Sequence, residues 1–184
     1  MENKPIVYQG NTKSGKQIII RYPMISDTPV ILDYFNTLSS EKTFIRFQGE
    51  QLTLQEETVY MNDFMLKMSQ HKAVKLLVFH NNQLIGVADI RMEDKISGHV
   101  GIFGITIAKD FRKDGIGKLL MKLIIDEAKK YLVDLKIITL GVFSDNPLAH
   151  KMYRAMGFTD YGRLPEGVKH KDLYVDHIWM YLKV

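Results

Sequence analysis

The sequence contains no cysteine among its 184 residues. This absence excludes disulfide bonds, metal sites built on thiolates and catalysis by a covalent thiol nucleophile. A group-transfer reaction would therefore use another nucleophile or pass the group directly to its acceptor. We assign no metal site to the chain.

Long apolar segments are also missing. No run is long enough to span a bilayer, and the first residues, Met1 to Pro5, lack the charged-then-apolar pattern of a signal peptide. We therefore expect a soluble, cytoplasmic protein with no membrane partner. The chain has no internal repeat and no linker-like stretch, and its 46% hydrophobic and 25% charged residues are typical of a globular domain. We expect a single domain over residues 1–184.

The charge balance is mildly basic, with a formal net charge of +4 at pH 7. Such a balance suits anionic ligands, including a phosphorylated cofactor. The basic residues do not cluster into a tail, and the sequence carries neither an RNP-like aromatic strand nor a helix-turn-helix signature. We expect no nucleic-acid partner.

Hydrophobic periodicity predicts a mixed α/β (α+β) fold. In the first part of the sequence we expect a hairpin formed by Ile6–Tyr8 and Gln17–Tyr22, followed by a helix capped by Asp27 or Thr28. A second helix is expected over Leu54–Ser69, and much of its apolar surface comes from Val59, Met61, Phe64, Met65 and Met68. The later chain predicts strands Ala73–His80, Gln83–Met92 and His99–Ala108, a helix from Gly115, a strand Ile137–Phe143, a helix Pro147–Met156 and a last strand Leu173–Val184. Together they predict a largely antiparallel central sheet flanked by helices, with one βαβ crossover from Ile102 to Phe143.

A glycine-containing turn opens the helix of the crossover. It reads Arg112-Lys113-Asp114-Gly115-Ile116-Gly117-Lys118 and follows a strand directly. The glycines let the backbone approach a ligand, and the free N–H groups of the helix start suit a diphosphate. Arg112 and Lys118 can add charged contacts, whereas Asp114 is expected to turn away or to cap. The alternative is that the glycines only shape the turn. Neither a third dinucleotide-binding glycine nor a Walker-type loop is present.

A second segment follows about thirty residues later. Asn146 ends a strand and Pro147 opens a helix, so Asn146 is expected to cap that helix. Tyr153 lies about two helical turns further on, with the small Ala149 on nearly the same face. Taken alone, Tyr153 would be a core tyrosine whose hydroxyl is satisfied.

Both segments resemble motifs of the GNAT superfamily of N-acetyltransferases. The first matches through Ile105-Thr106-Ile107 and Arg112-x-x-Gly115-x-Gly117, and the second through Asn146-x-x-Ala149-x-x-x-Tyr153-x-x-x-Gly157-Phe158. One departure is Lys109, where many members have proline. The resemblance implies that acetyl-CoA is the donor. Its pantetheine arm would pair with the backbone of Ile105, Thr106 and Ile107 and would also contact Asn146. Its diphosphate would lie beside Arg112 and bind the N–H groups of Lys113, Asp114, Gly115, Ile116, Gly117 and Lys118. The resemblance also implies that Tyr153 protonates the departing thiolate, which suits a phenol with a pKa near 10.

The sequence does not identify the acceptor of the acetyl group. The acceptor would be an amine, either a protein lysine or N-terminus, a polyamine, an amino acid or an antibiotic amine, and it would attack the thioester directly. Candidates for the base that takes the amine proton are His99, Asp89, Glu93, Asp176 and His177. The segment Glu41–Phe47 also resembles a stretch that borders the acceptor side in some GNAT proteins, although its phenylalanines can equally anchor a loop. A homodimer and a non-catalytic acyl-CoA-binding module are the remaining alternatives for assembly and for function.

Overall fold

The computed structural model describes residues 6–184, so Met1 to Pro5 lie outside the described residues. One eight-stranded sheet runs through the molecule in the order β1-β2-β3-β4-β5-β6-β8-β7. The strands are β1 (Ile6–Asn11), β2 (Gln17–Arg21), β3 (Ala73–His80), β4 (Gln83–Met92), β5 (Val100–Ile107), β6 (Ile137–Phe143), β7 (Thr159–His170) and β8 (Leu173–Lys183). The helices are α1 (Thr28–Ser40), α2 (Leu54–Ser69), α3 (Ile116–Tyr131) and α4 (Pro147–Ala155).

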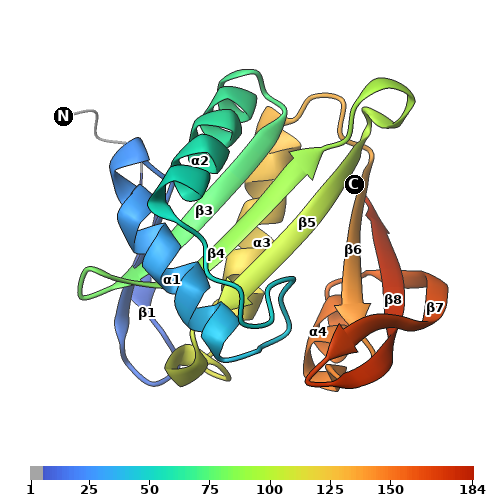
Figure 1. Cartoon of the computed structure of the whole chain (residues 1–184). Coiled ribbons are helices and arrows are strands. Elements are labelled where there is room, and N and C mark those ends of the chain that lie inside the picture. Colours follow the sequence, from blue (N-terminus) through green and yellow to red (C-terminus); the bar gives the residue numbers. More distant parts are fainter. Residues whose placement is uncertain (1–5) are drawn as a thin grey trace.

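The helices form a layer on each face of the sheet, with α1 and α2 on one side and α3 on the other (Figure 1). The larger core cluster packs α3 and Tyr153 of α4 against one face, and the smaller one packs α1 and α2 against Leu77, Leu84 and Val87 on the other. The expected mixed fold with one βαβ crossover is confirmed, because β5 and β6 are parallel and α3 connects them.

The start of each early helix is fixed locally. In α2, Thr53 accepts a hydrogen bond from the N–H of Glu56, and the Glu56 carboxylate accepts one from the N–H of Thr53. This reciprocal cap fixes the start of α2 at Leu54, where the sequence predicted it. Asp27 makes no side-chain cap to α1, because its carboxylate is held by Arg21 instead. The expected apolar role of Val59 in α2 was wrong, since Val59 is 65% exposed.

The strand β7 was not predicted. It contains Gly162, Pro165 and Gly167, and its pairing with β8 is interrupted twice by irregular register. Glycine and proline weaken a strand signal, and proline is tolerated in an edge strand because it need not donate to a neighbour. β7 is one of the two edge strands of the sheet and pairs with β8 alone. Its neighbour β8 therefore lies between β6 and β7.

The sheet opens between β5 and β6. The two strands pair only from Val100↔Ile137 to Ile102↔Thr139, after which they diverge while their outer edges stay paired with β4 and β8. Figure 1 shows the two strands together at one end and apart at the other, with the connection between α1 and α2 in front of the separation. We call the region between 103–107 of β5 and 140–143 of β6 the strand opening.

Candidate active site

The backbone of β5 offers hydrogen-bonding groups to the strand opening. Glu93 donates to the carbonyl of Val100 and Ala108 donates to the carbonyl of Ile85, so the even-numbered residues of β5 point their peptide groups toward β4. Because the direction alternates along a strand, the peptide groups of Ile105 and Ile107 point toward the opening. Those of Thr106 point to β4, and its side chain bonds the Tyr34 hydroxyl of α1 at 3.1 Å. Of the three predicted β5 residues, only Ile105 and Ile107 present backbone to the opening.

The predicted phosphate turn lies at the end of β5 and opens α3. Lys113 and Gly115 both have left-handed backbone, with φ of 66° and 84°, and Gly115 is the N-cap of α3 without a side-chain cap. Such a turn gathers successive N–H groups into a concave surface at the positive end of a helix. The helix supplies no side chain of its own to satisfy these groups. The turn therefore suits an anion.

The hairpin between β1 and β2 supports this turn from the side. The carboxylate of Asp114 accepts hydrogen bonds from the N–H of Ser14 at 2.8 Å and from its hydroxyl at 2.6 Å, which lowers the pKa of Asp114. Asp114 is thus turned away from the N–H groups. A Cβ on Gly115 would lie 3.2 Å from Cε of Lys13, so the Lys13 side chain covers that glycine. Lys13 brings a cation to the turn that sequence reasoning missed, because only the folded hairpin places it there.

Arg112 holds the end of β5 in place. Its Nε donates to the carbonyl of Ile107 at 2.9 Å, and one terminal nitrogen lies 3.4 Å from a carboxylate oxygen of Glu41 in the α1–α2 connection. These contacts tie that connection to the wide end of the strand opening. Lys118 is exposed on the first turn of α3.

The space and backbone conformation at Gly117 would allow a larger residue, unlike those at Gly115. A Cβ at Gly117 would meet only ordinary contacts, 3.7 Å from Sδ of Met152 and 3.8 Å from Cγ1 of Ile107. Its backbone is not left-handed, in contrast to that of Gly115. Packing within the described residues thus does not demand glycine at 117. A ligand that approaches the helix start closely would demand it.

Asn146 acts as a helix cap. Its side-chain oxygen accepts a hydrogen bond from the N–H of Ala149 at 3.2 Å at the start of α4. The amide nitrogen donates to no residue within 6–184 in the structure. One end of the side chain is therefore structural, and the donor end is available to a ligand.

Tyr153 is buried against the strand opening. It is 8% exposed and packs edge-on to Phe103 of β5, with ring centroids 6.2 Å apart, and beside Phe158. Burial raises its pKa to about 12. The Tyr153 hydroxyl forms no hydrogen bond with another described residue, and it is not among the fully buried polar atoms that lack a partner, so the end of this buried side chain remains accessible. The hydroxyl is a protonated donor without an internal acceptor.

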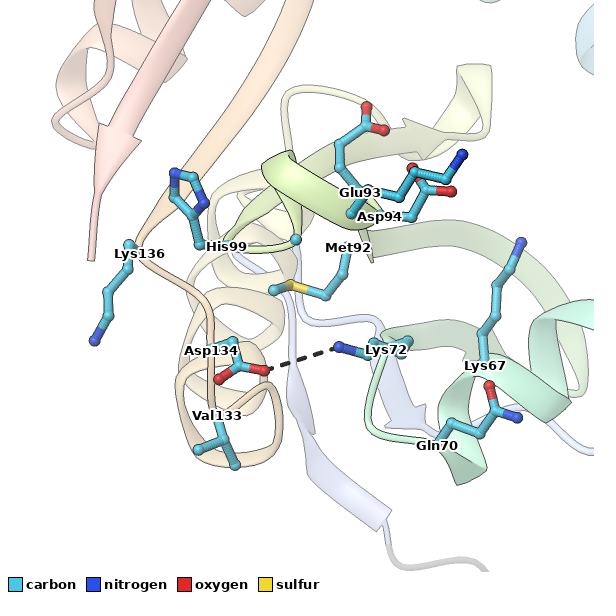
Figure 2. Close-up of a pocket in the computed structure, with 12 residues that line it drawn as sticks. Lys67, Gln70, Lys72, Met92, Glu93, Asp94, His99, Val133, Asp134 and Lys136 are labelled. Atoms are coloured by element: carbon cyan, nitrogen blue, oxygen red, sulfur yellow. Dashed lines mark ion pairs between the residues drawn. The ribbon is translucent and has the colours of Figure 1, made fainter.

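The five candidate bases lie in different parts of the structure. Asp176 is committed to Arg163 at 2.5 Å and to the N–H of Glu166, contacts that lower the pKa of Asp176. His99 and Glu93 lie at the end of the sheet opposite the phosphate turn. There they line a cavity of about 680 Å³ with several lysines and the ion pair of Lys72 and Asp134 (Figure 2). This cavity does not reach the strand opening. Only Asp89 and His177 lie beside the opening.

A smaller cavity of about 260 Å³ lies between α1 and the start of β4, and it includes Tyr34, Glu41 and Ala108. Neither cavity contains Asn146 or Tyr153. We therefore define the site by the diverging strands and the phosphate turn, which bring together the separate sequence motifs. Within the described residues no helix is both long and apolar enough to cross a membrane.

The fold agrees with a match to a known protein family. The model of the acetyltransferase (GNAT) family matches residues 34–158, and the chain belongs to that family. The expected family and enzyme class are thereby confirmed.

Solved structures agree with this assignment. A GNAT-family acetyltransferase from Streptococcus pneumoniae is 25% identical, with 91% of this chain and 99% of that chain covered and a TM-score of 0.82. Ribosomal-protein-alanine N-acetyltransferase from Brucella melitensis is 19% identical over 90% of this chain and 99% of that one, with a TM-score of 0.75. The yncA protein of Salmonella typhimurium, solved with its cofactor acetyl-CoA, is 17% identical over 90% and 93%, with a TM-score of 0.77. The last two share the fold.

Proposed function

We propose that the protein transfers the acetyl group of acetyl-CoA to a primary amine by direct attack of the amine on the thioester. The observation that carries this proposal is the junction of three features: an anion-binding turn, an open β5 edge and a buried tyrosine donor. Acetyl-CoA presents a diphosphate, an amide-containing arm and a thioester in that order. The yncA protein carries this same donor.

The residues present fit such a donor. The N–H groups from Lys113 to Lys118 hold the diphosphate, with Lys13 as an additional cation. The peptide groups of Ile105 and Ile107 pair with the arm as a neighbouring strand would. Gly117 leaves the helix start accessible to the diphosphate. Asn146 donates its free amide N–H groups to the arm while its oxygen caps α4.

Each residue at the thioester end has a chemical role. Acetyl-CoA supplies an activated acetyl group whose carbonyl carbon accepts the amine. A backbone N–H at the Ile105 end of the open β5 edge polarises the carbonyl oxygen as it gains charge. Tyr153 donates its proton to the sulfur as the carbon–sulfur bond breaks. The pKa of about 12 keeps the phenol protonated at neutral pH, and the same desolvation raises the pKa of a thiol formed beside it.

We further propose that residues 1–184 form one acetyltransferase domain that acts in the cytoplasm. The homodimer stays a prediction.

The proposal is tested by mixing purified protein and acetyl-CoA with a panel of amines and measuring free-thiol release. The panel includes a lysine peptide, peptides with free N-termini, polyamines, amino acids and aminoglycosides. We expect amine-dependent release with at least one class and acetylation of that amine by mass spectrometry. Acetyl-CoA binding without release for every amine would favour the non-catalytic binding module.

The two ends of Asn146 give a separate prediction. In Asn146→Asp the capping oxygen is kept but the N–H donors are lost, so the melting temperature should stay unchanged while the Kd for acetyl-CoA rises about tenfold. In Asn146→Ala the cap is lost as well, which should lower the free energy of unfolding by about 1 kcal/mol. Thermal denaturation and calorimetric titration measure the two effects. Equal affinity of Asn146→Asp and wild type would remove Asn146 from the donor site.

A further inference from the structure

Two glycines flank the strand opening just beyond the last β5–β6 pair. Ile102 and Thr139 form that pair, and Gly104 and Gly141 each follow two residues later. Alternation along the strands places both glycines on the α1–α2 face, since Phe103 and Leu140 are buried in the core on the α3 face. The beginning of the opening is therefore free of side chains from β5 and β6 on this face.

The ring of His177 occupies the space beside one of these glycines. A Cβ at Gly141 would collide with Nε2 of His177, which comes from the neighbouring strand β8. The imidazole lies on the Trp179 ring, with centroids 4.4 Å apart, and meets Phe143 edge-on at 6.1 Å. Neither ring nitrogen bonds another residue within the described chain. Glycine at 141 thus allows a free imidazole to lie against β6 at the opening.

We propose that His177 is the general base that takes the proton from the acceptor amine at the side of the strand opening marked by Gly104 and Gly141. The inference rests on the proposed acetyl transfer and adds the base, which family membership does not identify. The amine nitrogen bonds to the acetyl carbon and the carbon–sulfur bond breaks with its electron pair leaving on sulfur. The amine proton passes to an imidazole nitrogen of His177, and Tyr153 protonates the sulfur on the other face of the sheet.

The surroundings of His177 keep it in the form that accepts a proton. Burial lowers its pKa below the ordinary value near 6.5, so the ring is neutral at physiological pH. At lower pH the ring is protonated and cannot act as a base. Activity should therefore fall as the pH drops through this lowered pKa.

Most charged groups on the elements around His177 form ion pairs with other residues. Asp176 of β8 pairs with Arg163 of β7, Asp145 before α4 pairs with His170, and Glu41 pairs with Arg112. Glu166 of β7 and Lys42 of the α1–α2 connection are exposed. Across the opening, a Cβ at Gly104 would lie 3.9 Å from Oδ1 of Asp89, whose carboxylate lies 3.2 Å from Nε of Arg91 and 4.0 Å from Nζ of Lys75. Asp89 thus lies beside two cations, although its Oδ1 accepts no hydrogen bond and burial raises the pKa of its carboxyl, whereas His177 forms no ion pair within the described residues.

The test replaces His177 by glutamine and measures amine acetylation as a function of pH. We expect kcat for His177→Gln to fall about 100-fold, the usual size of a general-base effect, with an unchanged Kd for acetyl-CoA. In the wild type, the plot of log kcat/KM against pH should be steeper by one unit below the pKa of His177 than above it. The pH profile of His177→Gln should lack this change of slope, which we call the pH break. His99→Gln, an exposed histidine at the far end of β5, is the matched control and should keep both rate and break.

A second variant tests the position of the ring without removing it. Gly141→Ala should displace the imidazole and lower kcat at least about tenfold, with acetyl-CoA affinity retained. If the wild type acetylates an amine but His177→Gln keeps its rate or its pH break, the base is another group and the inference is wrong. Parallel loss of acetyl-CoA affinity and activity in His177→Gln would also overturn it, because the role would then be structural. Failure of the wild type to acetylate any amine would instead contradict the proposed function.

Discussion

Replacing Tyr153 by phenylalanine is expected to lower kcat about 100-fold while leaving the Kd for acetyl-CoA unchanged. The hydroxyl is the only group removed, and it makes no hydrogen bond within the described residues that folding would lose. The packing of the ring on Phe103 and Phe158 is preserved. The free energy of unfolding should therefore stay nearly the same, because the hydroxyl has no hydrogen bond to lose and is not among the buried polar atoms that lack a partner. A lower kcat with unchanged stability and unchanged affinity for acetyl-CoA is what loss of a proton donor should produce.

Steady-state kinetics, calorimetric titration of acetyl-CoA and thermal denaturation measure these three quantities. Tyr161→Phe is the matched control, because Tyr161 lies on β7 and is 57% exposed. It should behave like the wild type. An unchanged kcat for Tyr153→Phe would remove Tyr153 from the mechanism and leave it as a core residue.

The second large effect is expected at the start of α3. In Gly117→Glu a carboxylate enters the first turn of the helix, where the positive helix end stabilises it. The same carboxylate would lie near the diphosphate. Two unit charges about 5 Å apart at an effective dielectric constant of about 20 repel by about 3 kcal/mol, which corresponds to a loss of about 100-fold in affinity. We therefore expect a stable helix with strongly weakened acetyl-CoA binding.

The control for charge is Gly117→Ala, which adds only a methyl group in ordinary contact with Met152 and Ile107. Its Kd should rise less than that of Gly117→Glu. Calorimetric titration compares the affinities, and circular dichroism follows the helix. Unchanged affinity in Gly117→Glu would mean that the diphosphate does not bind at this turn.

Much of the fold could be predicted because periodicity and caps are local signals. The bounds of α2, β3, β4 and β6 were predicted correctly, since each has an uninterrupted pattern between clear turn or cap residues. β5 and α4 were each within a residue or so of the structure. β7 was missed because its pairing compensates for its glycines and proline, and pairing is not a local property.

The site was predictable in its motifs but not in its spatial arrangement. Gly115, Asn146 and Tyr153 carry local signatures, whereas the divergence of β5 and β6 depends on which strands pair beside them. Lys13 reaches Gly115 only because the first hairpin packs on the turn. Gly141 appears as an ordinary strand glycine until β8 brings His177 across it. No spacing in the sequence encodes that contact.

The most direct test of this account is a crystal structure of the protein with CoA and the acceptor amine identified by turnover. We expect the diphosphate on the N–H groups from Lys113 to Lys118, the arm along Ile105 and Ile107, and the sulfur beside the Tyr153 hydroxyl. A diphosphate bound away from this turn, or an arm that does not enter between β5 and β6, would contradict it.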